Sequence, residues 1–260
     1  MLHKFFNLNK IPFMPDQRNI FESKSLIMGK LKLQSILYAP QIAVVTGQVG
    51  AGKTMMVNSF VNSLDPMEFR IISTSLTNPS IRSLYKNIAT FGGIRTAVYG
   101  DDTKLQIVSY FDEMISQGKH TIVILDECHS FSYEVLDELK TFFDLKRNFS
   151  LILVGQSSFN KKITHSLSLP LKQRISVFIK MEDLSLEETR AYVEYRLKEA
   201  GASSPIFDEK CYPTLYQLTG GIFRMIDQAC YQTLSTAYFN KQSIITEQML
   251  KDAFESLNYN

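Results

Sequence analysis

Eight consecutive residues match the phosphate-binding pattern G-x-x-x-x-G-K-S/T without a mismatch: Gly47, Gln48, Val49, Gly50, Ala51, Gly52, Lys53 and Thr54. Glycines in such a loop let backbone N–H groups converge on phosphate oxygens, because no Cβ stands in the way. The ammonium of Lys53 would neutralise the β- and γ-phosphates of a nucleotide, and the hydroxyl of Thr54 would be a ligand for Mg²⁺. The spacing therefore predicts that ATP and Mg²⁺ bind here.

A second group of reactive side chains ends an apolar run. Residues 121–125 are apolar or β-branched, and two carboxylates, Asp126 and Glu127, follow directly. Carboxylates at the end of a buried strand need a metal or another partner. The arrangement matches the Walker B pattern, in which Asp126 would hold the Mg²⁺ shell and Glu127 would polarise the water that attacks the γ-phosphate. Cys128 and His129 come next, but two adjacent residues point different ways and do not chelate a metal alone.

The flanking segments are of the kind that bring such residues to one edge of a sheet. Residues 42–45 are apolar and largely β-branched, which predicts a buried strand before the glycine loop. Met55 opens a helical apolar spacing after the loop, so the positive end of that helix would face the same phosphates. Further strands are expected at residues 69–73, 151–154 and 175–179. We therefore expect an α/β domain with a parallel sheet, in which residues from Gly47 to Met55 bind the nucleotide.

Composition agrees with a globular protein in a reducing compartment. The chain has 260 residues, of which 45% are hydrophobic and 21% charged, enough for one large domain and a small one. The three cysteines, Cys128, Cys211 and Cys230, have no paired spacing and indicate neither disulfides nor a zinc site. No apolar run approaches the ~18 residues of a membrane span, and the N-terminus lacks a signal-peptide core. We expect a cytoplasmic protein without a membrane partner.

Three parts are expected along the chain. Residues 1–40 are predicted to form an N-terminal segment that packs on the ATPase core. Residues 41–181 would form the α/β ATPase domain. From residue 182 the apolar period is helical throughout, and Ser185 and Glu188 have the spacing of a capping box. Residues 182–260 are therefore predicted to form a small helical lid.

Several motifs resemble those of the AAA+ ATPases, and more closely those of the ExeA-like branch. The matching segments extend over nearly the whole chain: Phe5-Phe6-x-Leu8, Pro12-Phe13, Thr46-Gly47-x-Val49-Gly50, Leu125-Asp126-Glu127-Cys128-His129, Leu184-Ser185-x-x-Glu188-Thr189 and Arg196-Leu197-x-x-Ala200-Gly201. The resemblance implies a three-layer P-loop NTPase domain of the AAA+ type with a parallel sheet, followed by a helical lid. It also implies ATP hydrolysis to ADP and phosphate.

The same resemblance assigns roles to three more residues. Gln156, a polar residue after a buried strand, stands at sensor 1, where it could reach the attacking water. Arg174 precedes the last strand and looks like the arginine finger that reaches a neighbouring subunit's γ-phosphate. Arg224 follows Gly220-Gly221-Ile222-Phe223 at the start of a lid helix and looks like sensor 2, which contacts the nucleotide. These roles imply a ring or helical homo-oligomer that depends on ATP.

Stand-alone members of this size resemble the ATP-dependent regulators of DNA transposition, whose oligomers sit on target DNA and recruit a transposase. This resemblance implies that the chain is an ATPase with duplex DNA and a transposase as partners. Two alternatives stay open. One is an ExeA-like secretion or assembly ATPase that acts on a protein partner, and the other is a nucleotide switch without DNA affinity. Salt-dependent binding to duplex DNA would separate the first interpretation from the other two.

An interval without acidic residues supplies the candidate DNA contacts. From Phe69 to Gly100 the sequence has no Asp or Glu. It has hydrogen-bonding and basic side chains, followed by one more lysine after the interval: Thr77, Asn78, Ser80, Arg82, Lys86 and Lys104. Arg82 and Lys86 are four residues apart and so share one helical face. No base-reading motif is present, so we expect contacts mainly to phosphate and little dependence on DNA sequence.

Overall fold

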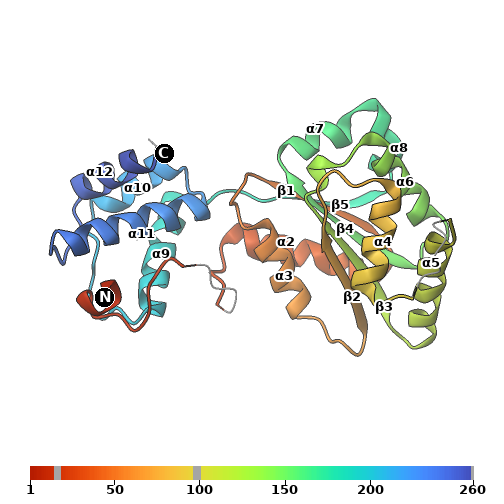
Figure 1. Cartoon of the computed structure of the whole chain (residues 1–260), viewed down its shortest axis with the longest axis horizontal. Coiled ribbons are helices and arrows are strands. Elements are labelled where there is room, and N and C mark those ends of the chain that lie inside the picture. The colour runs from red at the N-terminus through yellow and green to blue at the C-terminus, as the bar shows by residue number, and fades with distance from the viewer. Residues whose placement is uncertain (15–18, 96–100, 259–260) are drawn as a thin grey trace. The chain divides into compact units, whose positions relative to one another are not determined.

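A computed structural model of the whole chain describes residues 1–14, 19–95 and 101–258 (Figure 1). The chain forms two compact units. One unit is continuous, Ser25–Met181, and contains the sheet. The other combines two segments from the ends of the chain, Met1–Lys24 and Glu182–Asn260, and is helical.

A five-stranded sheet with the order β2-β3-β4-β1-β5 forms the centre of the first unit. The strands are β1 (Ile42–Gly47), β2 (Phe69–Ser75), β3 (His120–Asp126), β4 (Phe149–Gln156) and β5 (Ile175–Lys180). Every pairing is parallel, so all five carboxyl ends lie at one edge of the sheet. The three central strands, β1, β3 and β4, are buried over almost their whole length, which explains why their sequences are nearly continuous apolar runs.

Helices cover both faces of this sheet, with α2 and α3 on one side and α4, α5 and α6 on the other (Figure 1). Their bounds in chain order are α2 (Lys24–Leu33), η1 (Gln34–Leu37), α3 (Lys53–Asn62), α4 (Ile81–Gly92), α5 (Asp101–Ser116), η2 (Cys128–Ser130), α6 (Tyr133–Asp144), α7 (Ser158–Thr164), η3 (Ser166–Ser168) and α8 (Leu169–Lys172). This is the predicted three-layer α/β architecture.

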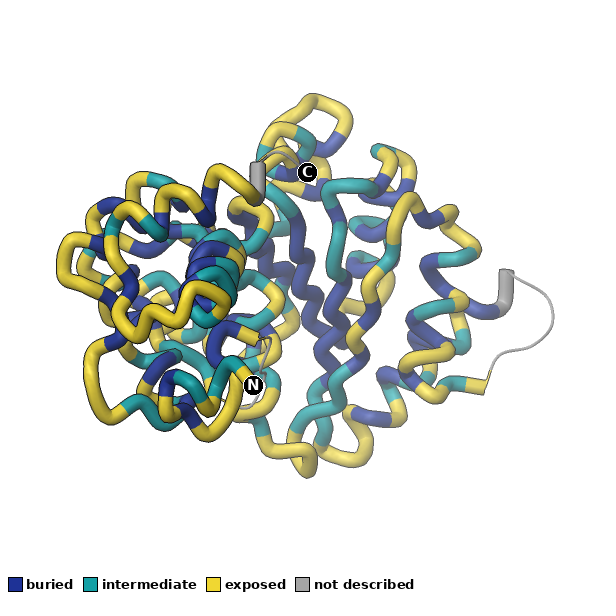
Figure 2. Tube along the Cα trace, turned by 60° about the vertical axis from the view of Figure 1, so that its left-hand side comes forward, coloured by how far each residue is buried: buried dark blue, intermediate teal, exposed yellow. Residues whose placement is uncertain are grey.

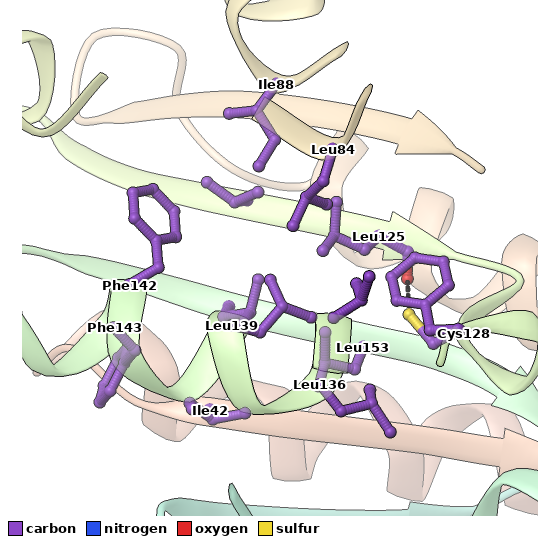
Figure 3. Packing of buried hydrophobic residues seen from close by; sticks show 14 of the residues in the cluster. Ile42, Leu84, Ile88, Leu125, Cys128, Leu136, Leu139, Phe142, Phe143 and Leu153 are labelled. Carbon is purple, nitrogen blue, oxygen red and sulfur yellow. Dashed lines mark hydrogen bonds between the residues drawn. The ribbon is translucent and has the colours of Figure 1, made fainter. Parts of the chain in front are cut away.

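Alternate strand residues fill the core between the sheet and α6. Ile42, Leu125 and Leu153 project from three neighbouring strands toward Leu139 and Phe142 of α6 (Figure 3). All five side chains are fully buried. Because successive strand residues point to opposite faces, this packing fixes which side chains reach the layer formed by α4 to α6.

The second unit has its own core. Its helices are α1 (Leu2–Phe5), α9 (Leu186–Glu199), α10 (Cys211–Thr219), α11 (Phe223–Phe239) and α12 (Glu247–Asn258). The predicted capping box is present at the start of α9, where Ser185 accepts from the N–H of Glu188 and the Glu188 side chain accepts from the N–H of Ser185. Buried residues lie along the inward sides of these helices, and exposed residues lie on their outer sides (Figure 2).

The N-terminal segment differs from the prediction of one piece, residues 1–40, on the ATPase core. Its first 24 residues belong to the helical unit, where Phe6, Leu8 and Phe13 are buried in the core. The N–H of Asn9 also donates to the carbonyl of Ala200 at 2.7 Å. The remainder, from Ser25, belongs to the sheet unit. The boundary at residue 40 is therefore corrected to Lys24, because the early aromatic residues fill a gap among the helices.

Candidate nucleotide site

The glycine loop joins the carboxyl end of β1 to the amino end of α3. Gly50 and Gly52 have φ values of 85° and 82°, in the left-handed region that residues with a Cβ rarely adopt. A Cβ on Gly47 would lie 2.9 Å from the Cβ of Met181. The loop conformation thus depends on glycines where the sequence has them, and the loop leads directly into the amino end of α3. This cradle fits an anion such as a nucleotide phosphate.

The side chain of Lys53 folds back over the loop. Its Nζ donates to the carbonyl oxygens of Gly47 at 3.1 Å and Gln48 at 2.6 Å. These contacts hold a positive charge beside the loop that would bind the phosphates. Lys53 is the first residue of α3, so the helix and the ammonium present positive potential to the same ligand.

Thr54 and Asp126 meet although they are 72 residues apart. The Thr54 hydroxyl donates to Oδ2 of Asp126 at 2.7 Å. Thr54 comes from the start of α3 and Asp126 from the end of β3, so the parallel sheet brings them together. An alcohol oxygen and a carboxylate oxygen side by side are the hard ligands that Mg²⁺ prefers. The pair therefore fits the predicted metal site, and Mg²⁺ bound there would neutralise phosphate charge.

Glu127 follows Asp126 in a left-handed conformation, with φ of 63°. Its N–H donates to Oδ1 of Asp126 at 2.7 Å, and its side chain is 45% exposed, with Oε2 3.3 Å from Nδ1 of His129. Cys128 points the other way and is buried, with its thiol donating to the carbonyl of Leu125 at 3.1 Å. Burial raises the pKa of the Cys128 thiol well above its usual range, so it is a packing residue and not a nucleophile. The accessible Glu127 carboxylate fits the predicted role of base.

Gln156 is the last residue of β4 and lies at the same edge. In the parallel register it pairs with Gly47, the first residue of the glycine loop. The side chain is half-buried. Residue 155 must be small, because a Cβ there would lie 2.9 Å from the ring of Phe159. The strand order places β4 between β1 and β3, so Gln156 stands between the phosphate loop and the two carboxylates.

Comparison with known proteins agrees with this geometry. Residues 36–163 match a family described as "AAA domain". The ORC1 protein of Aeropyrum pernix, solved in complex with DNA, is similar over 94% of this chain and 68% of its own, with a TM-score of 0.70 and 16% identity. Cdc6p from Pyrobaculum aerophilum is similar over 93% of this chain and 67% of its own, with a TM-score of 0.66 and 16% identity.

The fold is that of a P-loop NTPase of the AAA+ type. At these identities the solved structures bear on the fold alone. Among curated proteins, general secretion pathway protein A of Aeromonas hydrophila is 30% identical over 257 residues, which are 92% of this chain and 45% of that protein. An uncharacterized HTH-type transcriptional regulator of Methanocaldococcus jannaschii is 24% identical over 212 residues, 78% of this chain and 52% of that protein. The chain spans about half the length of these curated relatives.

Within this AAA+ fold Arg174 lies far from the phosphate loop of the same chain. It directly precedes β5, at the amino edge of the parallel sheet, whereas the loop is at the carboxyl edge. Six strand residues at ~3.3 Å each separate the two edges by about 20 Å. Nε of Arg174 donates to both carboxylate oxygens of Asp144, at 2.8 and 3.2 Å. These charge-assisted bonds lower the pKa of Asp144 to about 2.

Asp144 is a partner that the sequence did not reveal. It lies at the end of α6, 30 residues from Arg174, and no local pattern marks the pair. The same carboxylate also accepts from Arg147 at 3.1 Å and lies 3.5 Å from Nζ of Lys140. The Asp144 carboxylate therefore gathers three basic groups at the amino edge.

Arg224 belongs to the helical unit. It is the second residue of α11 and is exposed. Gly220 and Gly221 before it have φ values of 60° and 76°, and a Cβ on Gly221 would lie 2.0 Å from the carbonyl oxygen of Leu184. The Gly-Gly pair thus fixes the turn from which Arg224 projects. Its role as sensor 2 stays a prediction.

The candidate DNA contacts separate into two groups. Thr77, Asn78 and Ser80 in the loop between β2 and α4 are exposed, as are Arg82 and Lys86 on α4. This loop and the exposed side of α4 form what we call the β2–α4 face. Ser80 also caps α4, because its side chain accepts from the N–H of Ser83.

Lys104 does not resemble the other members of that set. Its Nζ donates to Oε1 of Glu138 at 2.6 Å and lies 5.8 Å from the ring centre of Tyr85. The Tyr85 hydroxyl donates to the same carboxylate. Because Glu138 neutralises the ammonium between α4, α5 and α6, Lys104 serves the packing of these helices and is not a candidate for contact with DNA phosphates.

Proposed function

We propose that this protein is a Mg²⁺-dependent ATPase. The observation that carries the proposal is the contact between Thr54 and Asp126 at 2.7 Å, with the accessible Glu127 carboxylate next to it. These groups lie at the carboxyl edge of a parallel sheet, beside a glycine loop in left-handed conformation. The arrangement supplies a phosphate cradle, a pair of metal ligands and a base within one site.

Each residue has a part in hydrolysis. The glycine loop and Lys53 hold the β- and γ-phosphates, and Thr54 and Asp126 hold Mg²⁺, which when bound offsets the charge of the triphosphate. Glu127 accepts a proton from the attacking water while the water oxygen forms a bond to the γ-phosphorus. The bond between the γ-phosphorus and the bridging oxygen of the β-phosphate breaks, which releases phosphate and leaves ADP. Gln156, between the loop and the carboxylates, orients that water. The sensor 2 role of Arg224 rests on the resemblance of the sequence motifs alone.

The site also requires a second subunit. Arg174 lies about 20 Å from its own phosphate loop, by strand length, and so cannot complete its own site. A neighbouring copy in a ring or helical assembly could present Arg174 to the γ-phosphate. Hydrolysis would then depend on assembly, and ATP would be a ligand that holds the assembly together.

We further propose that the assembly binds duplex DNA and regulates a transposase. The support is the β2–α4 face, where Arg82 and Lys86 lie on the exposed side of α4 beside a loop of polar residues. Such groups suit phosphate contacts. A solved structure of similar fold, the ORC1 protein of A. pernix, was determined in complex with DNA. Recruitment of a transposase rests on the resemblance of the sequence motifs.

A second candidate is an ATPase that acts on a protein partner in secretion or assembly. The 30% identity to general secretion pathway protein A over 92% of this chain favours it. Among the described residues, no helix combines the length and the apolar character needed to cross a bilayer. The nucleotide chemistry is the same for both candidates, and they differ in the ligand of the assembled protein. A third candidate function for the same site is a nucleotide switch that binds no DNA.

Duplex-DNA binding separates these candidates. We expect the protein with a non-hydrolysable ATP analogue and Mg²⁺ to bind duplexes of unrelated sequence with similar affinity. The affinity should fall steeply as salt rises, because bound phosphates release counterions. Lys53→Ala should bind poorly under the same conditions, since it cannot hold the nucleotide. Absence of binding by the parent protein, with and without the analogue, would favour the secretion ATPase or the switch.

A further inference from the structure

The backbone of Glu127 is held in an unfavourable conformation by its neighbours. A left-handed φ of 63° brings the Cβ of a non-glycine residue close to backbone atoms. The carbonyl of Glu127 accepts two hydrogen bonds from one residue, Ser130, from its N–H at 2.9 Å and from its hydroxyl at 2.9 Å. The N–H of Glu127 donates to Oδ1 of Asp126. Ser130 therefore helps to determine where the Glu127 side chain points.

The same Ser130 hydroxyl reaches a second segment. Its oxygen accepts from the N–H of Asn78 at 3.0 Å, in the loop of the β2–α4 face. Asn78 is also left-handed, with φ of 47°. A hydroxyl has one proton to donate and lone pairs to accept, so both bonds form at once. The carbonyl of Leu76 is a more distant alternative acceptor at 3.4 Å. One side chain thus joins two left-handed residues from separate segments.

The bond from Asn78 to Ser130 lies just beyond the last paired residues of β2 and β3. The ladder between β2 and β3 ends where Ser75 pairs with Asp126, and the following bond, from Leu76 N to Asp126 O, is already 3.5 Å long. Beyond that point the Ser130 hydroxyl continues the connection between the two segments. A displacement of the loop around Asn78 would therefore change the hydrogen bond to Ser130 before it changed the bonds of the ladder.

The turn after β3 is also held by a lysine from α7, in addition to its contacts with the loop around Asn78. Nζ of Lys162 on α7 donates to the carbonyls of His129 at 2.8 Å and Phe131 at 2.7 Å. Cys128, which directly precedes His129, is fully buried. Because these contacts fix the turn from within the unit, movement of the exposed loop would change the Ser130 bonds rather than shift the whole turn.

We propose that Ser130 is a positioning residue that links the β2–α4 face to Glu127. The proposal rests on the ATPase function given above. It extends the proposed DNA binding by naming the residue through which bound DNA would change the rate of hydrolysis. A duplex on the β2–α4 face moves the loop, the loop moves the Ser130 hydroxyl, and Glu127 changes its orientation toward the attacking water. The link acts on the rate of hydrolysis and not on the affinity for ATP.

The test compares three variants with the parent protein. Ser130→Ala removes the hydroxyl, Ser130→Thr keeps it, and Ser116→Ala removes an exposed hydroxyl that donates only to a carbonyl of its own helix, Glu113 O at 2.7 Å. We expect Ser130→Ala to lower kcat about 3- to 10-fold, as one net hydrogen bond allows, with KM for ATP within about twofold. Its response to duplex DNA should be lost. Ser130→Thr and Ser116→Ala should behave as the parent does.

Amide hydrogen exchange provides a readout that needs no catalysis. In Ser130→Ala, exchange should quicken in both linked segments, residues 76–80 and 126–130, and stay unchanged in α9 of the helical unit. Parent-like exchange in these segments together with a parent-like kcat would overturn the link. If the parent protein hydrolyses no ATP, the proposed function fails while the exchange data still decide whether Ser130 joins the segments. If the parent hydrolyses ATP at a rate that DNA does not change, transmission through Ser130 is overturned and the ATPase assignment stands.

Discussion

The hydroxyl of Thr54 lies 2.7 Å from a carboxylate oxygen of Asp126, across 72 residues of sequence. If the two oxygens hold Mg²⁺, then Thr54→Ala and Asp126→Asn should each weaken binding of MgATP at least about tenfold, as loss of a metal ligand does. Thr54→Ser keeps the hydroxyl and should bind as the parent does. Titration with a fluorescent ATP analogue, with Mg²⁺ and with chelator, checks this. Equal losses with and without Mg²⁺ would contradict a metal role.

Arg174 should act only in a neighbouring subunit. Arg174→Ala should lower hydrolysis on the order of 10³-fold, as loss of a finger arginine does in related phosphoryl transfer. Mixing it with Lys53→Ala should restore part of the activity, because a mixed interface can combine an intact loop with an intact Arg174. The measurement is phosphate release from the separate and mixed proteins.

A matched mixture serves as the control for that experiment. Lys53→Ala with Glu127→Gln has Arg174 in every subunit but lacks a complete phosphate site in any, so it should stay inactive. Absence of recovery in the Arg174→Ala mixture, where mixed oligomers are shown to form, would refute a role in trans.

The β2–α4 face should carry the phosphate contacts to DNA. Replacing Arg82 and Lys86 by alanine should weaken duplex binding and make the log–log salt dependence shallower by about one per lost contact. A control with two alanines at Lys32 and Lys198, both exposed and outside this face, removes the same charge. The measurement is duplex affinity against salt with an ATP analogue. Equal effects of the two double variants would show that only net charge matters.

The stability of the helical unit should depend on the protonation of Asp227. Its Oδ1 accepts from the Tyr192 hydroxyl at 2.8 Å, and burial raises the pKa of Asp227 to about 6. In the unfolded chain an aspartate has a pKa of about 3.9, so between these values the folded state holds a proton that the unfolded state has released. This group therefore destabilises the fold above pH 6, and the penalty disappears as pH falls toward 4.

Asp227→Asn should remove that dependence. The amide oxygen can still accept from Tyr192, and no charge is buried, so the free energy of unfolding at pH 7 should rise by about 3 kcal/mol. Chemical denaturation at several pH values between 4 and 7 measures it. Asp252→Asn, at an exposed site on α12, is the charge-matched control. If the free energy of unfolding of the variant depends on pH as steeply as that of the parent, then ionisation of Asp227 does not destabilise the folded state.

Local patterns were enough to predict which residues lie together at the carboxyl edge of the sheet. The glycine loop lies within eight residues, and Asp126 follows its strand directly, so each motif contains its own flanking structure. The parallel sheet then had to bring the two motifs together, which follows once both are recognised as strand ends. The strands and the three layers were predictable for the same reason, because buried parallel strands are continuous apolar runs.

Contacts between distant side chains were not predictable in this way. The ion pairs of Arg174 with Asp144 and of Lys104 with Glu138 join residues 30 and 34 positions apart, and neither acid lies in a recognisable motif. Lys104 therefore looked like a free cation. The first 24 residues were placed on the wrong unit because an apolar segment shows that it needs a core and not which core it joins.

Glu127→Gln tests the central claim, hydrolysis at this site, most directly. The amide keeps the size of the side chain but cannot take a proton from water, so phosphate release should fall at least about 100-fold, as loss of a general base does. Binding of MgATP should be retained, and the variant should accumulate as the ATP-bound assembly. The parent protein and Lys53→Ala, which should not bind ATP, are measured beside it. Phosphate release by Glu127→Gln at the parent rate, with ATP bound equally well, would contradict the account.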